Sequence, residues 1–259
     1  MKSAMNLTNR DLELFKKLSS YGMLSTQQLR RIVFGGIALT TVLRRLRLLE
    51  ENFFVRRLDG LSSHELLWML TPKGAETGKA LLPKRNWSKN MLEHDYKLLS
   101  LRLLSEGEGI ARLWTPEHEI RSKVFRNYGI RGAKNKLIPD GIMSAEVNGI
   151  QESVAIELEL TLKNQMKLKE TLRRYQETTS TFAVWYIVPS VAIMNQVQKV
   201  WNECIWNRSS IKLIFSNLDE VMREPLKAGL IIKGRSVYLG EYWRSLPAQV
   251  GAQRVSTQS

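Results

Sequence analysis

The sequence predicts a mixed α/β (α+β) protein of two domains, with helices and a hairpin first and a mixed sheet second. Three observations favour this class. The chain has 259 residues, 43% of them hydrophobic, which is enough apolar material for two modest cores. Apolar residues recur at helical spacing in the first third. Short strand-like runs then alternate with helical patterns, and strands joined by crossover helices form a mixed sheet.

The first third begins with three expected helices. In the first, the apolar residues have helical spacing, Thr8 can cap the start together with Asp11, and Gly22 ends the run. A second helix starts at Ser25-Thr26 and ends near Gly35-Gly36. A third helix turns its apolar residues inward, namely Leu39, Val42, Leu43, Leu46 and Leu49.

A hairpin and a further helix complete this first domain. Residues 53–58 and 65–70 have strand character on either side of a turn at Asp59-Gly60. Thr71-Pro72 then starts a helix with a cap and a first-turn proline. Helices followed by a hairpin predict a winged helix over residues 1–85. This stretch holds 15 Lys plus Arg against 7 Asp plus Glu, so it is the expected binder of double-stranded DNA.

A second domain is expected from residue 86 to residue 247, after the periodicity stops near residues 83–86. It begins with a helix from Ser88 to about Ser105. Residues 248–259 have few apolar anchors and are expected to form a flexible tail. The strand-like segments are residues 110–114, 137–143, 153–160, 182–188 and 211–215, and the helical patterns between the later ones are residues 164–178 and 192–206.

The formal net charge of +14 favours a polyanionic partner, with nucleic acid first, through long-range attraction and counterion release. A membrane surface is the competing interpretation, but the longest apolar run, near residues 183–188, is far too short to span a bilayer. The amino terminus lacks the continuous apolar stretch of a secretion signal. Because Cys204 is the sole cysteine, no internal disulfide can form, and a cytoplasmic location is expected.

Three carboxylates between residues 139 and 164 form the expected site of chemistry. Asp140 lies in Pro139-Asp140-Gly141, and Glu157 and Glu159 lie two residues apart in a run whose alternation predicts a strand. Both glutamates would then point to one face, roughly 6.5–7 Å apart at the backbone. One or two divalent ions with their waters can bridge that span.

Carboxylates repel phosphate, so in a chain this basic they suit a phosphate site only if Mg²⁺ or Mn²⁺ reverses the local charge. In that scheme Asp140 bridges metal and phosphate, Glu157 is a second ligand, and Glu159 binds metal or orients water. Lys163 would approach the phosphate. The alternatives are that the glutamates occupy the exposed face of an ordinary antiparallel strand and that Lys163 is a solvated lysine.

Five arginines of the first domain are predicted to bind DNA. Arg44, Arg45 and Arg47 lie largely outside the apolar stripe of the third helix and would enter or flank the major groove. Arg56 and Arg57 on the hairpin would hold backbone phosphates. The alternative is a solvated charged helix face, which any basic protein carries.

The sequence lacks the motifs of zinc sites and of nucleotide-driven motors, and it gives little support to a tyrosine nucleophile. The three histidines stand alone, with no His-x-His or His-Glu-x-x-His pattern, so a zinc site is not supported. A glycine-rich phosphate loop ending in Lys-Ser or Lys-Thr is also missing, which argues against a nucleotide-driven motor. Tyr96, Tyr128 and Tyr175 are candidate nucleophiles, but packing or stacking is favoured because no obvious base is adjacent in the sequence.

Several short motifs, in a consistent order along the chain, resemble those of one family of DNA-processing proteins. The chain resembles the replication-relaxation family, and within it most nearly the MobC class of plasmid mobilisation relaxases, over residues 7 to about 190. The motifs are Leu7-Thr8-Asn9-Arg10-Asp11, Tyr21-Gly22, Gln28-Leu29, Leu70-Thr71-Pro72-Lys73-Gly74, His94-Asp95, Pro139-Asp140-Gly141, Glu157-Leu158-Glu159-Leu160-Thr161, Lys163-Asn164 and Val188-Pro189.

The resemblance implies a winged helix joined to a restriction-endonuclease-like domain that nicks one strand of plasmid DNA at a transfer or replication origin, with other mobilisation proteins as partners. It also implies that Asp140, Glu157 and Glu159 carry the Mg²⁺- or Mn²⁺-dependent cleavage. The usual nuclease pattern has a lysine two residues after the glutamate, where this chain has Glu159. Some restriction enzymes also have a glutamate there, and the departure leaves the role of Lys163 open.

A non-catalytic DNA-binding regulator of replication or transcription is the main alternative to a nuclease. RNA binding is less favoured because the aromatic strand motifs and glycine loops of common RNA-binding modules are missing. The sequence leaves open the DNA target, the number of metal ions, a nick or a double-strand cut, a covalent intermediate and the oligomeric state.

Overall fold

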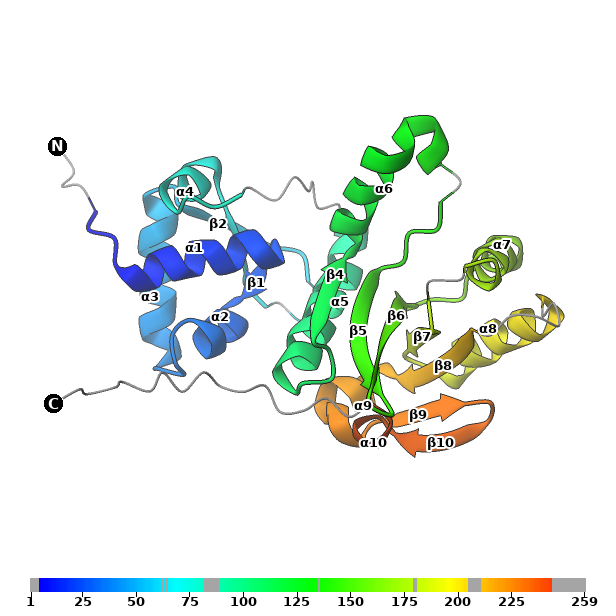
Figure 1. The fold of residues 1–259 in the computed structure, drawn as a ribbon. Coiled ribbons are helices and arrows are strands. Elements are labelled where there is room, and N and C mark those ends of the chain that lie inside the picture. Colours follow the sequence, from blue (N-terminus) through cyan, green and yellow to red (C-terminus); the bar gives the residue numbers. More distant parts are fainter. Residues whose placement is uncertain are drawn as a thin grey trace, which may run out of the picture. The chain divides into compact units, whose positions relative to one another are not determined.

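The computed structural model describes residues 5–61, 63, 65–81, 89–134, 136–178, 181–204 and 211–243 (Figure 1). The chain is mixed α/β, which confirms the predicted class. It forms two compact units, residues 1–99 and 100–259, and each is described by itself. The predicted boundary near residue 85 and the predicted tail at residues 248–259 lie outside the described residues and stay predictions.

Before α5, the described part of the first unit has three helices, a three-stranded sheet and a short fourth helix (Figure 1). Strand β3 pairs antiparallel with β1 on one side and with β2 on the other. This element order and this sheet are those of a winged helix. The elements are α1 (Asn9–Tyr21), β1 (Leu24–Ser25), α2 (Thr26–Ile32), α3 (Leu39–Glu51), β2 (Val55–Leu58), β3 (Leu67–Leu70) and α4 (Pro72–Thr77).

The predicted helix starts are fixed by local hydrogen bonds. At α1, the backbone N–H of Asp11 donates to Thr8 Oγ1 at 3.3 Å, and the backbone N–H of Thr8 donates to Asp11 Oδ2 at 2.7 Å. Ser25 and Gln28 form the same reciprocal pair at α2. These bonds satisfy backbone donors that a helix start leaves without intrahelical partners. Gly22 follows α1 with φ 82°, in the left-handed region that favours glycine.

The hairpin differs from its prediction in length. Strands β2 and β3 have four residues each, whereas six were expected in each strand, at residues 53–58 and 65–70. Strand β1 was not predicted, because two residues are too few to show an alternation. Leu24 and Ser25 become a strand through their pairing with Trp68 and Leu67.

The second unit is built on a seven-stranded mixed sheet in the order β10-β9-β8-β7-β6-β5-β4. The pairs β6–β7 and β7–β8 are parallel and the others are antiparallel. The division between the units falls within α5. The elements are α5 (Lys89–Gly107), β4 (Leu113–Pro116), α6 (Glu117–Ala133), β5 (Gly141–Val147), β6 (Ile150–Leu158), α7 (Gln165–Gln176), β7 (Ala183–Val188), α8 (Val191–Cys204), β8 (Lys212–Asn217), α9 (Leu218–Arg223), a 3-10 turn (Pro225–Lys227), β9 (Gly229–Ile232), β10 (Arg235–Tyr238) and α10 (Leu239–Tyr242).

Helices α7 and α8 cover one face of this sheet (Figure 1). Leu172 of α7 and Val197 of α8 belong to one buried cluster with Tyr186 of β7. Trp185 points to the opposite face, because successive strand residues alternate, and it packs edge-on against Trp243 with ring centroids 4.6 Å apart. Strand β7 is therefore covered on both faces, which explains its continuous apolar sequence.

Several elements of the second unit escaped prediction. Helix α6 was missed because its apolar residues do not recur at helical spacing, and its backbone is interrupted at Gly129. The carboxyl-terminal elements α9, β9, β10 and α10 are only four to six residues long, too short for a periodic signal. No helix in the described ranges is long and apolar enough to cross a membrane.

Candidate functional site

The pairing of β5 with β6 brings two of the predicted carboxylates together. Asp140 directly precedes β5, whose first residue, Gly141, pairs with Ile156. One step further along this antiparallel register, Asp140 lies opposite Glu157. The Oδ2 atom of Asp140 accepts a hydrogen bond from the backbone N–H of Leu158 at 2.8 Å. The sequence motif Pro139-Asp140-Gly141 therefore opens a strand, as expected, next to the end of β6.

Glu157, in β6, and Glu159, just after the end of β6, are both buried. Glu157 is 7% exposed and Glu159 is 5% exposed. Glu157 pairs in parallel with Tyr186, and the backbone N–H of Glu159 continues that pairing by donating to the carbonyl of Ile187. Burial of this degree excludes the alternative in which these acids decorate the exposed face of an antiparallel strand.

Each glutamate has a specific partner. The hydroxyl of Tyr175, on α7, donates to Glu157 Oε1 at 2.5 Å. Lys163 Nζ lies 2.5 Å from Glu159 Oε2 in an ion pair. Lys163 was predicted to approach a phosphate, and here its charge is shared with Glu159, although 44% of its side chain remains exposed.

The electrostatics of the cluster follow from its burial. Burial, and next the charge of Asp140, raise the pKa of Glu157 to about 8, although Tyr175 and Lys163 act in the opposite direction. Burial also raises the pKa of Glu159, against the effect of its ion pair with Lys163. Burial lowers the pKa of Lys163, but Glu159 and the neighbouring carboxylates outweigh it and raise the pKa above its ordinary value. The cluster thus has more carboxylates than positive charges to balance them.

Two tyrosines lie beside the cluster, a role that their positions in the sequence did not indicate. Tyr175 and Tyr186 are 1% and 0% exposed, and burial, with the nearby carboxylates, raises the pKa of each well above its usual value. Both are therefore neutral phenols, poorly suited to act as nucleophiles. The hydroxyl of Tyr186 has no hydrogen-bond partner within the described ranges.

A pocket of about 640 Å³ adjoins the cluster within the second unit. Its charged lining consists of two carboxylates and five cations, so its electrostatic character suits a group that is itself anionic. The lining residues are Arg121, Phe125, Ile130, Ala133, Lys134, Lys136, Leu137, Ile138, Asp140, Glu157, Lys163, Thr171 and Arg174.

The three carboxylates predicted to bind metal differ in their partners. Among the residues that the structure describes, no group of three or more histidine, cysteine, aspartate or glutamate side chains is arranged to hold a metal ion. The predicted third ligand, Glu159, is instead paired with Lys163. Asp140 and Glu157 fit a site of two protein ligands, because Mg²⁺ is commonly bound through one or two carboxylates and keeps several waters. A divalent ion would also stabilise the charged form of Glu157, which burial and the repulsion from Asp140 disfavour.

The predicted DNA-binding arginines fall into two groups. Arg44 and Arg47 on α3 and Arg56 on β2 are exposed. Arg57 is half-exposed and donates to Glu50 Oε1 at 2.9 Å. Arg45 differs from these residues because its guanidinium donates to the buried carboxylate of Asp11 through both Nε and Nη2.

The Arg45–Asp11 pair is part of the fold of the first unit. Arg45 Nε donates to Asp11 Oδ1 at 2.9 Å, and Asp11 is 1% exposed. Although burial raises the pKa of Asp11, its hydrogen bonds with Arg45 and Thr8 lower it below its ordinary value. Helical periodicity shows that Arg45 lies off the apolar stripe, but it cannot show that Asp11 lies beside it.

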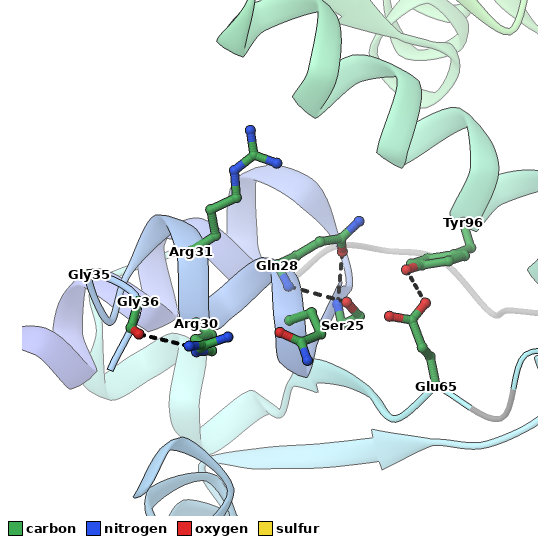
Figure 2. Close-up of a pocket in the computed structure, with 9 residues that line it drawn as sticks. Ser25, Gln28, Arg30, Arg31, Gly35, Gly36, Glu65 and Tyr96 are labelled. Atoms are coloured by element: carbon green, nitrogen blue, oxygen red, sulfur yellow. Dashed lines mark hydrogen bonds between the residues drawn. The ribbon is translucent and has the colours of Figure 1, made fainter. Parts of the chain in front are cut away.

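A second pocket, of about 610 Å³, lies beside α2 in the first unit (Figure 2). Most of its polar groups bond to one another: Ser25 to Gln28, Tyr96 to Glu65, and Arg30 Nη2 to the carbonyl of Gly36 at 2.9 Å. Figure 2 shows Arg31 extending away from these bonded groups, and it is exposed. These polar groups therefore stabilise the first unit and do not by themselves indicate a ligand. Arg31 is an exposed cation that was not among the predicted DNA-binding residues.

Comparison with known proteins identifies no family for this two-unit α/β protein. No family model matches the sequence, and neither does any curated protein. Among solved structures, a variant of the Lactococcus lactis protein ZitR is similar with a TM-score of 0.25 and 16% sequence identity. The match covers 41% of this chain and 66% of that chain. A TM-score this low carries no argument about fold or function.

Proposed function

We propose that this protein is a metal-dependent DNA endonuclease of the plasmid mobilisation relaxase kind, which nicks one strand at a transfer or replication origin. The observation that carries the proposal is the pairing of the buried Glu157 with the partly buried Asp140, which lie side by side and line a pocket whose other charged residues are cations. The cations attract a backbone phosphate. Mg²⁺ or Mn²⁺ bound to the two carboxylates would polarise that phosphate and activate a water.

The residues around the pair have distinct roles in this proposal. The backbone N–H of Leu158 fixes Asp140, and the hydroxyl of Tyr175 orients Glu157. Lys163, anchored by Glu159, lines the pocket with 44% of its side chain exposed, and from there it can approach the phosphate. The ion pair thereby gives Glu159 a positioning role in place of the metal-binding role predicted for it.

The winged helix would dock on double-stranded DNA. The exposed side chains of Arg44 and Arg47 suit the major groove or its flanks, and Arg56 and Arg57 suit the phosphate backbone. Arg45 is left out of this contact set because it is committed to Asp11. The proposed sequence of events is duplex docking by the first unit and strand cleavage by the second.

A plasmid nicking assay tests the catalytic part. Supercoiled plasmid carrying candidate origins is incubated with the full chain, with and without Mg²⁺ or Mn²⁺. Asp140→Asn and Glu157→Gln should each abolish relaxation while DNA binding is retained, because these changes remove a metal ligand and keep the side-chain shape. Glu152→Gln, on the same strand β6 but partly exposed, is the matched control and should nick normally. Unchanged nicking in either of the first two variants would remove that residue from the mechanism.

A non-catalytic DNA-binding regulator is the second candidate. It is favoured by the lack, within the described residues, of a group of three metal-binding side chains and by the raised pKa of Glu157, which keeps this carboxyl largely protonated near neutral pH. Binding of Mn²⁺, followed by electron paramagnetic resonance, separates the candidates without any DNA. Binding that is lost in Asp140→Asn supports the nuclease, and equal weak binding by wild type and variant supports the regulator.

A further inference from the structure

Helix α6 carries a row of cations and exposed apolar side chains. From Arg121 to Lys136 the sequence has six lysines and arginines and no acidic residue. Phe125, Tyr128 and Ile130 are 41%, 53% and 83% exposed. Of the helix residues only Ile120 and Ala133 are buried. Aromatic rings left outside a core in so basic a stretch have the composition of a nucleic-acid-binding surface.

An interruption at Gly129 brings two of these side chains to the same pocket. Around a regular helix, Phe125 and Ile130 would point about 140° apart, since they are separated by five residues. At Gly129 the backbone leaves the helical region, with φ 65° and ψ 177°, and both residues line the pocket together with Asp140 and Glu157. This backbone conformation is essentially restricted to glycine.

The cations of this pocket are available to a phosphate. Lys134 and Lys136 line it, and neither has a carboxylate partner within the described part of the chain, although Lys136 Nζ lies 4.2 Å from the centroid of the Tyr128 ring. Arg121 and Arg174 are paired with acids one helical turn away, at side-chain exposures of 49% and 32%. Exposed ion pairs of this kind contribute only about 0–1 kcal/mol, so a phosphate can take the place of the carboxylate.

An intact duplex does not expose the base faces on which the Phe125 ring could stack. In a double helix the base faces are stacked on one another, and phosphates, sugars and base edges face outward. A base that has left the stack offers a flat face, and aromatic rings in cationic grooves bind single strands through such faces. A volume of about 640 Å³ is that of a pocket for a small ligand, which suits a nucleotide better than a double helix.

We propose that this pocket holds an unpaired segment of DNA, with one base stacked on Phe125 and the neighbouring phosphates bound by Lys134 and Lys136. The inference rests on the proposed nuclease function, because the held strand is the one whose phosphate would reach Asp140 and Glu157. It adds the substrate class: the second unit acts on single-stranded or locally melted DNA, and intact duplex is bound by the first unit.

Binding measurements without metal test this proposal separately from cleavage. Fluorescence anisotropy of the full chain is recorded in EDTA with labelled oligo-dT and with a duplex of the same length. Phe125→Ala should weaken binding of the single strand about tenfold, equivalent to about 1.4 kcal/mol, and leave duplex binding unchanged. Because Phe125 is 41% exposed, its replacement does not empty the core.

Three further variants identify stacking as the cause. Phe125→Trp should retain single-strand affinity, because it keeps an aromatic face. Phe125→Leu should lose affinity as Phe125→Ala does, because it keeps only apolar bulk. Ile150→Ala removes another exposed apolar side chain, at the first residue of β6, and should bind as wild type does.

The outcomes distinguish this proposal from the proposed function. Unchanged single-strand affinity in Phe125→Ala, or an equal loss for single strand and duplex, overturns the strand pocket. A selective loss supports it, even if the protein never nicks plasmid in Mg²⁺ or Mn²⁺, in which case the nuclease proposal alone fails. Nicking by the wild type, combined with no effect of Phe125→Ala on binding, supports the nuclease and overturns the strand pocket.

Discussion

Glu157 combines two properties that conflict in a protein without a bound cation. Its side chain is buried, with an exposed fraction of only 7%, and it lies opposite a second carboxylate, Asp140. Burial and the second charge both favour its neutral form and bring its pKa to about 8. A strand position that served only stability would be better filled by an apolar residue, so the conflict points to a function that needs an ionisable group.

Glu157→Gln should change how stability depends on pH. The folded pKa, about 8, lies above the ordinary value of 4.5, so between these values the folded state binds a proton that the unfolded chain has released. Stability of the wild type should therefore be fully present below about pH 4.5 and fall as the pH rises to about 8, by at most about 1.4 kcal/mol per pH unit. Glu157→Gln lacks this slope. Urea denaturation of both proteins from pH 5 to pH 9 measures it, and an identical slope in the variant contradicts the assignment.

Arg45 and Asp11 illustrate a residue-level limit of sequence reasoning. Capping by Thr8 and Asp11 was predictable, because the motif is local. The contact of Asp11 with Arg45 joins α1 to α3, and nothing in the spacing of either helix indicates it. Asp11 thus both caps α1 and forms an ion pair with Arg45. Arg45, which was predicted to contact DNA, stabilises the first unit through this pair.

The elements that sequence predicted well are those with local signals. Helices α1 and α2 have capping boxes, α4 has Thr71 followed by Pro72, and β7 is a continuous apolar run. Helix α6 has no such pattern: from residue 121 to 132 nearly every side chain is exposed. Two of its apolar residues, Phe125 and Ile130, line a pocket and do not pack in the core. Helical periodicity detects only apolar residues that repeat along a face packed against a core.

Gly129→Ala tests whether the interruption in α6 builds the strand pocket. An added Cβ at this position meets no atom within 4 Å, so the change acts only through the backbone, where φ 65° is unfavourable for alanine. Alanine favours a continuous helix, which moves Ile130 away from Phe125. Single-strand affinity should fall several-fold, by anisotropy in EDTA, while the circular dichroism of helices stays the same or rises.

Gly107→Ala is the control for that experiment. Gly107 also has open space around an added Cβ, but it lies at the end of α5 without a positive φ. It should leave DNA binding unchanged. Equal affinities of wild type and Gly129→Ala would show that the backbone break has no part in holding the strand.

At the scale of the whole molecule, the site depends on contacts that no single segment reveals. The motifs at Asp140 and Glu157 were visible in the sequence, and β5–β6 pairing places them together as expected. Tyr175, Tyr186 and Phe125 reach the cluster or its pocket from α7, β7 and α6. Their roles follow from how helices pack on the sheet, which a one-dimensional pattern does not specify.

The exposed cations of the two units have different neighbours, and under the two proposals they would make different kinds of DNA contact. The exposed arginines of the winged helix suit duplex phosphates, which are regularly spaced and carry no base faces. The cations near Asp140 accompany an aromatic ring, which suits an unpaired strand. If both assignments hold, substitutions in one unit should change one mode of binding and leave the other intact.

Replacing Arg44 and Arg56 together by alanine tests this division. Each removed phosphate contact should lower the dependence of duplex affinity on salt by about one unit in the logarithmic slope, because fewer counterions are released on binding. Oligo-dT affinity and cutting of a single-stranded oligonucleotide in Mn²⁺ should stay at the wild-type level, since Asp140, Glu157 and Phe125 are untouched. Anisotropy titrations across a salt series give both slopes from the same protein. A fall in oligo-dT affinity as large as the fall in duplex affinity would mean that one surface binds both forms of DNA, and the separate roles of the two units would have to be abandoned.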